Sequence, residues 1–210
     1  MKKLGALLVG LLLLSGCSAA GINQKAQLQT TTSTLRTQVG IQTKMLTLID
    51  NEAAAFPSTF EKAYAKDPTQ DFKAAGPVGV LLTSREQAYK RLEAAQEQIE
   101  TATTALTKVS SQRSPNLPEA ALSNALNSLK LAKLDHKTFD SYYKEMSSAE
   151  TTFFSTVAQA PDDEAAINAA LGRLNEYTSS LSQQAEIIQA NLQTVTKDVA
   201  ALSSAVAKMK

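Results

Sequence analysis

Apolar side chains recur at alternating spacings of three and four residues along most of this chain, the pattern of helices that bury one face. The pattern predicts four helical segments, over about 27–65, 83–111, 119–157 and 162–208. The last segment holds a heptad register broken chiefly at Thr178, and its length predicts a helix of roughly 70 Å. No strand-like alternation competes with these stripes. We therefore expect an all-α protein, an elongated antiparallel bundle of long helices with a spectrin-like or coiled-coil-like build.

The faces that we expect to be buried form one stripe per segment. In chain order they contain Leu28, Leu35, Val39, Leu46, Ile49, Ala53, Phe56 and Phe60; Ala88, Leu92, Ala95, Ile99, Ala102, Leu106 and Val109; Leu122, Ala125, Leu129, Ala132, His136, Phe139, Tyr143, Met146 and Phe153; and Leu171, Leu174, Leu181, Ala185, Ile188, Leu192, Val195, Val199, Leu202 and Val206. Thr32 and Gln42 interrupt the first stripe. Pro57 predicts a kink or break near Ala55, because proline lacks a backbone donor and clashes with the preceding turn.

Two stretches rich in helix breakers divide the segments. Residues 66–80 contain two prolines and two glycines and should form the longest loop. The stretch from Pro115 to Pro118 has two interpretations. A full turn there gives four helices, whereas a kink within one long helical path gives a three-helix arrangement.

The amino terminus has the order of a secretory signal. Lys2 and Lys3 are followed by an apolar run from Leu4 to Leu14. Eleven residues form roughly 17 Å of helix, against a hydrocarbon core of about 30 Å. We therefore expect residues 1–16 to be a signal peptide that is removed, not a membrane-spanning helix.

The signal ends in Leu14-Ser15-Gly16-Cys17, which resembles the bacterial lipobox. The resemblance implies cleavage between Gly16 and Cys17 and a diacylglyceryl group on the Cys17 thiol. Cys17 is the only cysteine, so the chain has no internal disulfide. Two acyl chains would anchor the protein stably without spanning the bilayer. We expect a polar tether over residues 17–29 and a single bundle domain over 30–210.

Composition narrows the partners. Without residues 1–16 the chain carries a formal charge of about −1, and it contains no tryptophan. A nearly neutral surface with few aromatic platforms does not favour nucleic acid. The expected partner is therefore the membrane, through Cys17.

Residues that catalysis or metal binding would need are sparse. The chain has one histidine, His136, and no set of nucleophile, base and acid at a recognisable spacing. We expect no enzymatic activity, cofactor or metal ion. His136 lies on an apolar stripe and should be a core-edge side chain with a satisfied hydrogen bond. Asp162, Asp163 and Glu164 lack the spacing of a calcium loop and are typical of a helix start.

Two clusters have a structural and a functional interpretation. Around the long loop, Lys62, Lys66, Lys73, Arg85, Lys90 and Arg91 alternate with Glu61, Asp67, Asp71, Glu86 and Glu93. This mixture favours a solvated surface over a site for an anionic polymer. The aromatic cluster of Phe139, Tyr142, Tyr143, Phe153 and Phe154 has helical spacing and should be core, with a carbohydrate or peptide groove as the alternative.

The order of motifs resembles a known family. The lipobox is followed by Phe56 and Phe60, a heptad helix, Phe139-Asp-Ser-Tyr-Tyr-Lys-Glu-Met, Glu150-Thr-Thr-Phe-Phe and Leu174-Asn-Glu-Tyr. This order is similar to that of the YkyA-type cell-wall-binding lipoproteins of Gram-positive bacteria. The resemblance implies an extended helical bundle on the outer face of the cytoplasmic membrane, directed towards the wall, and no catalytic residue.

The expected function is that of a non-enzymatic surface lipoprotein, a cell-wall-binding, envelope-interaction or spacer module, with peptidoglycan, another wall polymer or an envelope protein as its partner. Two alternatives remain open. A substrate-binding lipoprotein would normally use an α/β scaffold with a cleft. A self-associating coiled-coil scaffold is possible because a heptad stripe does not reveal whether it meets its own chain or another copy.

Overall fold

The computed structural model describes residues 24–74, 76–112, 114 and 116–209. They form four α-helices: α1 (Gln24–Tyr64), α2 (Gly76–Ser111), α3 (Glu119–Gln159) and α4 (Glu164–Ala207). None of these described helices combines the length and the apolar character that a membrane span requires. The all-α prediction is confirmed, and the proline-rich stretch before Glu119 is a turn between two helices.

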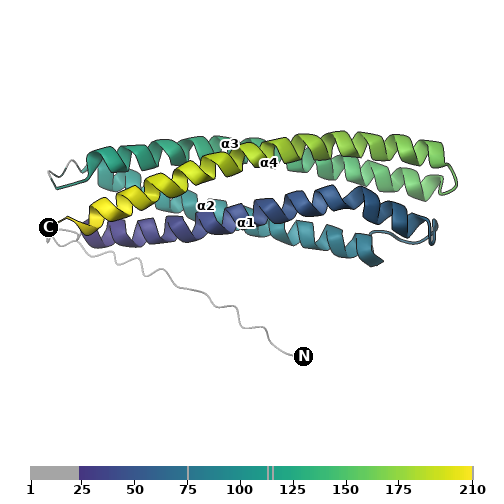
Figure 1. The fold of residues 1–210 in the computed structure, drawn as a ribbon, viewed down its shortest axis with the longest axis horizontal. Coiled ribbons are helices and arrows are strands. Elements are labelled where there is room, and N and C mark those ends of the chain that lie inside the picture. Colours follow the sequence, from purple (N-terminus) through teal and green to yellow (C-terminus); the bar gives the residue numbers. More distant parts are fainter. Residues whose placement is uncertain (1–23, 75, 113, 115, 210) are drawn as a thin grey trace, which may run out of the picture.

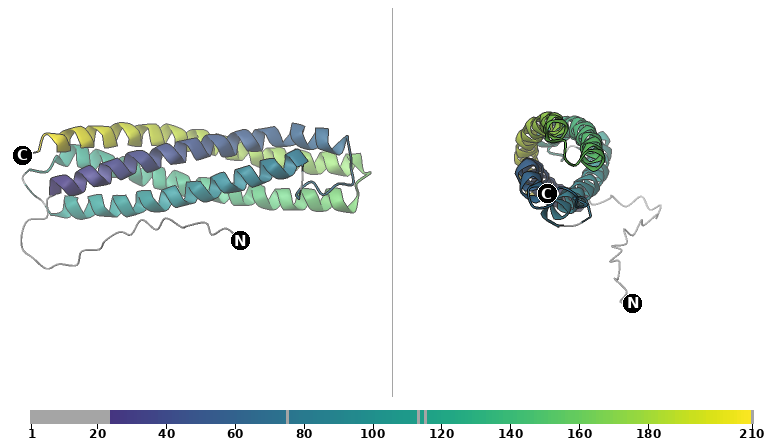
Figure 2. Two further views of the ribbon diagram at one scale, coloured as in Figure 1. Left: turned by 90° about the horizontal axis from the view of Figure 1, so that it is seen from below. Right: turned by 90° about the vertical axis from the view of Figure 1, so that its right-hand side faces the viewer.

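The four antiparallel helices form a long rod and follow one another around its axis (Figures 1 and 2). Helix α1 packs closely along α2, and α3 packs closely along α4. These two hairpins meet mainly through α1 and α4, whereas α2 and α3 touch only sparsely. At 1.5 Å per residue the rod is about 65 Å long. The packing therefore leaves one side of the bundle, between α2 and α3, less filled than the others.

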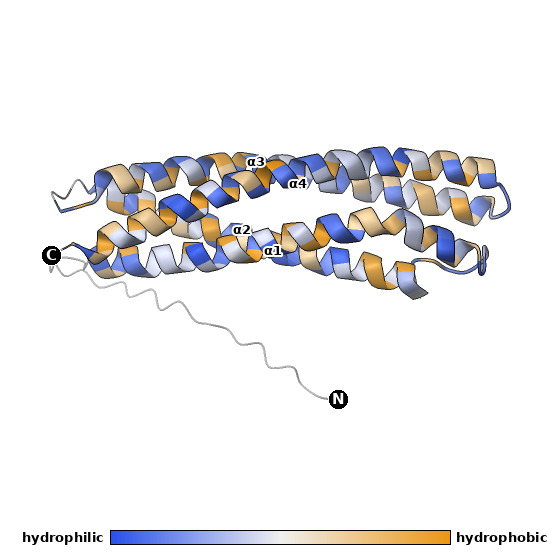
Figure 3. Cartoon of the chain, viewed as in Figure 1, coloured by the Kyte–Doolittle hydropathy of each residue, from blue (hydrophilic) through white to orange (hydrophobic). Residues whose placement is uncertain are grey.

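Every residue that we assigned to an apolar stripe is buried. Figure 3 shows the corresponding alternation of hydrophobic and hydrophilic faces along the helices. The two polar interruptions in α1 are buried as well, and each has a partner. The hydroxyl of Thr32 donates to the backbone oxygen of Leu28 at 2.8 Å, and the amide of Gln42 donates to Gln96 Oε1 at 2.8 Å. Satisfied hydrogen bonds explain why the core tolerates both side chains.

Two expected boundaries are wrong. Helix α1 begins at Gln24, so residues 24–29 belong to the bundle and not to the polar tether. Leu28 is fully buried and packs the first turns of α1 against the core. Helix α2 begins at Gly76, seven residues before the expected start at 83, because Val78 and Leu81 extend its buried face. The expected signal peptide, its cleavage after Gly16 and lipid on Cys17 lie outside the described residues.

Of the expected kink or break near Ala55, the break is wrong, because α1 continues through Pro57 to Tyr64. Proline still removes one backbone hydrogen bond there. Phe56 and Phe60, one on each side of Pro57, are both buried. Tertiary packing of these rings offsets the local preference for a break.

The two ends of the rod differ. The near end contains the start of α1, the end of α4 and the connection between α2 and α3 (Figure 1). The far end contains the loop from α1 to α2 and the turn from α3 to α4. At the far end the hydroxyl of Tyr64 donates to the backbone oxygen of Pro161, which joins these two connections. In the turn, Asp163 accepts a hydrogen bond from the backbone N–H of Ala166 at 3.0 Å, which confirms its role at a helix start.

A group of six rings closes the far end. We call it the far-end aromatic cluster: Phe56, Phe60, Tyr64, Phe72, Phe153 and Phe154. Phe60 is central, with its ring centroid 4.7 Å from that of Phe153 and 5.0 Å from that of Phe72. Phe72 comes from the long loop and is buried. The loop is thus held against the bundle by its own side chain.

Candidate functional site

The sparse contact between α2 and α3 is lined by polar side chains. Four pairs cross between the helices: Arg85 with Glu150, Tyr89 with Asp140, Glu93 with His136, and Glu100 with Lys133. We call these eight residues the α2–α3 seam. Elsewhere the helices face one another mainly through apolar side chains. All ion pairs that cross between the described helices therefore belong to the seam.

The innermost pair of the seam is a buried ion pair. Nη2 of Arg85 donates to Oε2 of Glu150, and the two residues are only 4% and 9% exposed. Arg85 Nε and Glu150 Oε1 are buried without a hydrogen-bond partner. The pair thus neutralises its own charge but leaves one donor and one acceptor unused.

Two tyrosine rings lie next to this ion pair. Tyr89 and Tyr143 stack with centroids 3.8 Å apart and an angle of 6° between their planes. The hydroxyl of Tyr89 donates to Oδ1 of Asp140. Burial, followed by this hydrogen bond, raises the pKa of Tyr89. Burial acts against the ionised form of Asp140, but its bonds to Lys144 and Tyr89 hold the pKa of that carboxyl below its usual value. Tyr89 is therefore a fixed, protonated donor at neutral pH.

The third pair contains the only histidine of the chain. His136 is buried, as expected, with Nε2 2.9 Å from Oε1 of Glu93. The expected satisfied hydrogen bond is met only on one side of the ring: Nε2 faces Glu93, whereas Nδ1 has no partner among the described residues. No described group reaches this side of the ring. Burial lowers the pKa of His136 by more than Glu93, Asp140 and Glu100 raise it, so the ring is neutral at pH 7.

Stability should therefore depend on pH through His136. A depressed pKa in the folded protein means that the unfolded chain takes up the proton first, near its ordinary pKa of about 6.5. The free energy of unfolding should then fall as the pH drops from about 7.5 to 5.5, by at most about 1.4 kcal/mol per pH unit. Urea unfolding followed by circular dichroism across this range measures the slope. The H136Q variant should be nearly flat, and an unchanged slope in that variant would refute the assignment to His136.

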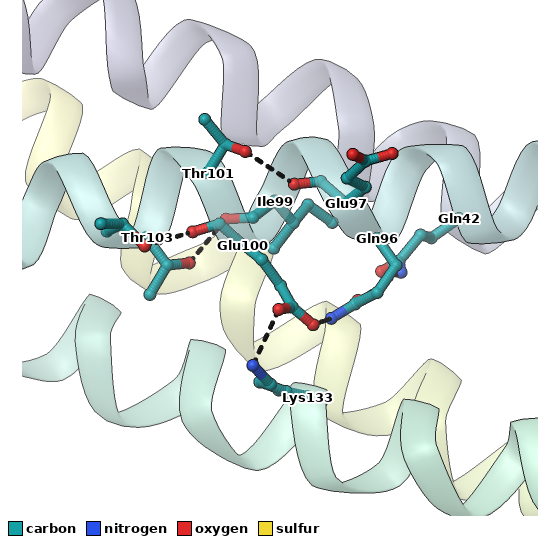
Figure 4. A network of polar contacts seen from close by, with 9 residues as sticks. Gln42, Gln96, Glu97, Ile99, Glu100, Thr101, Thr103 and Lys133 are labelled. Carbon is teal, nitrogen blue, oxygen red and sulfur yellow. Dashed lines mark hydrogen bonds and ion pairs between the residues drawn. The ribbon is translucent and has the colours of Figure 1, made fainter.

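The fourth pair extends into the core (Figure 4). Nζ of Lys133 lies 2.8 Å from Oε2 of Glu100, and Oε1 of Glu100 accepts from Gln96 at 2.9 Å. Gln96 in turn accepts from Gln42 on α1 at 2.8 Å. This chain of contacts joins α1, α2 and α3. It links three helices at the end of the seam nearer to the α2–α3 connection.

Cavities open along the seam. A cavity of about 470 Å³ lies between α2 and α3 at the Arg85–Glu150 pair and the stacked tyrosines. It shares Lys73 and Phe154 with a second cavity, of about 490 Å³, beside the long loop. A smaller space of about 220 Å³ surrounds His136. A separate cavity of about 480 Å³ lies between α3 and α4 and is lined mainly by small side chains.

The structure agrees to different degrees with the predictions for the aromatic cluster and for the basic cluster. The aromatic residues Phe139, Tyr143, Phe153 and Phe154 are core, as predicted, whereas Tyr142 is only half-buried. Tyr143 and Phe154 also line the cavity at the Arg85–Glu150 pair. For these two rings, burial in the core and a position in the wall of a groove are therefore compatible.

In the basic cluster the other five cations are exposed, but the prediction of a solvated surface is wrong for Arg85. Glu150 on α3 is the reason, since it supplies the charge that lets this guanidinium be buried. Sequence reasoning missed five residues of the seam: Tyr89, Glu100, Lys133, Asp140 and Glu150. Only Glu150 left a signal, because it falls in the apolar register of α3 between Met146 and Phe153.

Chemically, the seam offers fixed donors and acceptors of both charges. Within the described residues, no three histidine, cysteine, aspartate or glutamate side chains are placed to hold a metal ion. Comparison of the chain with models of protein families, with curated proteins and with solved structures gave no match.

Proposed function

We propose that this protein is a non-enzymatic lipoprotein of the bacterial envelope, which presents the α2–α3 seam to a ligand away from the membrane. The observation that carries the proposal is the placement of the start of α1 at the near end of the rod (Figure 1). Cys17 precedes Gln24 by seven residues, which reach at most about 25 Å when extended. Lipid on Cys17 would therefore hold the near end close to the bilayer and leave the far end free.

The position of the seam supports this arrangement. Arg85 lies nine residues into α2, which starts at the far end, so it is about 14 Å along the rod from that end. The larger seam cavity and the cavity at the long loop both lie in this far half. A rod of this length would place them beyond the lipid headgroups. This geometry agrees with the resemblance to the YkyA-type family, which implies a bundle directed towards the wall.

Removal of the anchor tests the proposal. In C17A the thiol that would carry lipid is absent, so we expect the protein to leave the membrane fraction and to incorporate no labelled fatty acid. The matched control is S18A, which alters the next residue and should remain in the membrane fraction. Metabolic labelling and fractionation measure both. Membrane retention of C17A with label elsewhere in the chain would contradict lipid anchoring.

Binding to the envelope is tested separately. Purified protein is incubated with peptidoglycan sacculi before and after removal of their attached anionic polymers, over a series of salt concentrations. Retention on bare sacculi supports direct recognition of peptidoglycan. Loss with the polymers or with modest salt indicates contact driven by charge. Absence of retention in every case rules out wall binding and leaves an envelope protein as the partner.

Self-association is a second candidate, favoured by one observation. Leu131 and Leu134 are each 55% exposed and lie three residues apart on α3, so they share one outer face. Light scattering of the purified protein tests this directly. A dimer that becomes monomeric in L131K would support a scaffold role, and a monomeric wild-type protein would exclude it.

A further inference from the structure

Unused hydrogen-bonding capacity is confined to one part of the described protein. The buried side-chain atoms that lack a partner are Arg85 Nε, Glu150 Oε1, Glu93 Oε1 and His136 Nδ1. All four belong to the α2–α3 seam. Glu93 Oε1 still lies 2.9 Å from Nε2 of His136, which leaves Arg85 Nε, Glu150 Oε1 and His136 Nδ1 without a polar contact. Buried polar atoms in native proteins are normally paired, so these three atoms on one seam need an explanation such as a ligand.

The cavity at the Arg85–Glu150 pair combines apolar and aromatic walls with a larger number of polar side chains. Its walls include Leu82, Phe154 and the stacked rings of Tyr89 and Tyr143, and its polar groups include the Arg85–Glu150 pair. Its volume of about 470 Å³ falls within the usual range for ligand pockets. The cavity therefore suits a compact ligand that is partly apolar.

The charges around the cavity favour a neutral ligand. Lys90 lies 2.6 Å from Glu86, and Lys144 lies 2.7 Å from Asp140, so both lysines are neutralised at the rim. The remaining lysine, Lys73, lies over the ring of Phe154 rather than at the ion pair. Inside the cavity the positive charge of Arg85 and the negative charge of Glu150 compensate each other. Among the charged residues that line the cavity, only the exposed Lys73 lacks an ion-pair partner, so a strongly charged ligand would find little uncompensated charge there.

We infer that this cavity binds a ligand through a neutral secondary amide. The amide oxygen would accept from the Nε–H of Arg85, and the amide N–H would donate to Oε1 of Glu150. The small apolar groups on either side of the amide would contact Leu82 and the tyrosine rings. Both polar atoms are covered in the free protein, so ligand binding requires Arg85 and Glu150 to rotate towards the cavity that they line.

An amide of this kind has two sources in an envelope, an N-acetylated sugar and a peptide. The inference rests on the proposed function only in that the envelope supplies the ligand. Soluble probes test it without a membrane. A failure to bind them is thus distinguishable from a failure of lipid anchoring, which fractionation of C17A reports.

The Nε–H group of Arg85 can itself report ligand binding by NMR. Its proton–nitrogen NMR signal is followed while three probes are added: N,N′-diacetylchitobiose, a dialanine peptide with blocked ends, and cellobiose. Cellobiose is the matched control, because it is a disaccharide without an amide. We expect at least one amide probe to shift the signal and cellobiose to leave it unchanged. A response to the chitobiose alone identifies an N-acetylated sugar as the source, and a response to the peptide alone identifies a peptide.

A pair of variants assigns the binding to the cavity. R85K keeps the positive charge beside Glu150 but lacks the Nε–H donor, so the affinity for the active probe should fall about tenfold or more. R173K is the matched control, because Arg173 lines the separate cavity between α3 and α4. It should bind like the wild type. The wild-type titration stands as a test even if R85K does not fold.

Three results would overturn the inference. The first is the absence of any shift of the Arg85 signal with either amide probe at the highest soluble concentration. The second is an equal response to cellobiose, which would show that hydroxyl groups or ring stacking suffice. The third is unchanged affinity in a folded R85K variant.

Discussion

Replacing Phe60 with alanine should lower the free energy of unfolding by about 3–5 kcal/mol, the range for deletion of a buried phenylalanine ring. Phe60 is 1% exposed and has ring contacts with Phe56, Tyr64, Phe72 and Phe153. The cavity left by its removal would adjoin the far-end loop, so the surrounding rings collapse only in part. Guanidinium unfolding followed by circular dichroism gives the change.

Tyr177 provides the matched control for Phe60. It is also an aromatic residue on a long helix, but its side chain is 40% exposed. Y177A should change the free energy of unfolding by less than about 1 kcal/mol. Equal losses in the two variants would show that the far-end aromatic cluster is not the packed centre that its ring contacts indicate.

Replacing Arg85 with alanine should lower the free energy of unfolding by about 3–5 kcal/mol, because Glu150 would remain as a buried charge without its partner. The same unfolding measurement tests this value. The double variant R85M/E150L removes both charges and fills similar space. The free energy of unfolding of the double variant should lie close to that of the wild type, since an apolar pair often replaces a buried ion pair without loss of stability.

The surface pair of Lys90 and Glu86 is the control for this experiment. Both side chains are largely exposed, and the contact spans one turn of α2. K90A should cost less than about 1 kcal/mol. If R85A lowered the free energy of unfolding as little as K90A, the Arg85–Glu150 pair would have to be solvated in solution, and the seam would be open to water.

The helical pattern of the chain allowed most of the core to be predicted. The four stripes were recognisable because each helix buries a single face, and a period near 3.6 is visible without knowledge of the partner helix. The ends of the helices were less predictable. Gln24 and Gly76 begin helices in polar or breaker-rich sequence, where one or two buried side chains such as Leu28 and Val78 decide the boundary.

Pro57 shows how tertiary packing overrides a local preference. Taken alone, a proline predicts an interruption. Within the bundle, Phe56 and Phe60 contact rings from α3 and the long loop, and α1 continues through the proline. Those contacts come from residues distant in the chain, so no local pattern reveals them.

The candidate site was only partly visible beforehand. Arg85 and Glu150 each occupy a position in the apolar register of their helix, a signal that the prediction of a solvated surface for Arg85 overlooked. Nothing in the spacing shows that they meet, since 65 residues separate them along the chain. Tyr89 and Asp140 occupy ordinary helical positions and became part of a site only through the approach of α2 to α3.

The sequence by itself determined that this protein is a bundle of long helices, because the alternation of apolar and polar side chains along each helix is a local property. The tertiary structure decided which helices pack closely and which meet through polar pairs. That choice depends on how two hairpins dock through α1 and α4, which leaves α2 and α3 farther apart. The space between them is filled by long charged and aromatic side chains, and this is why the candidate site lies there.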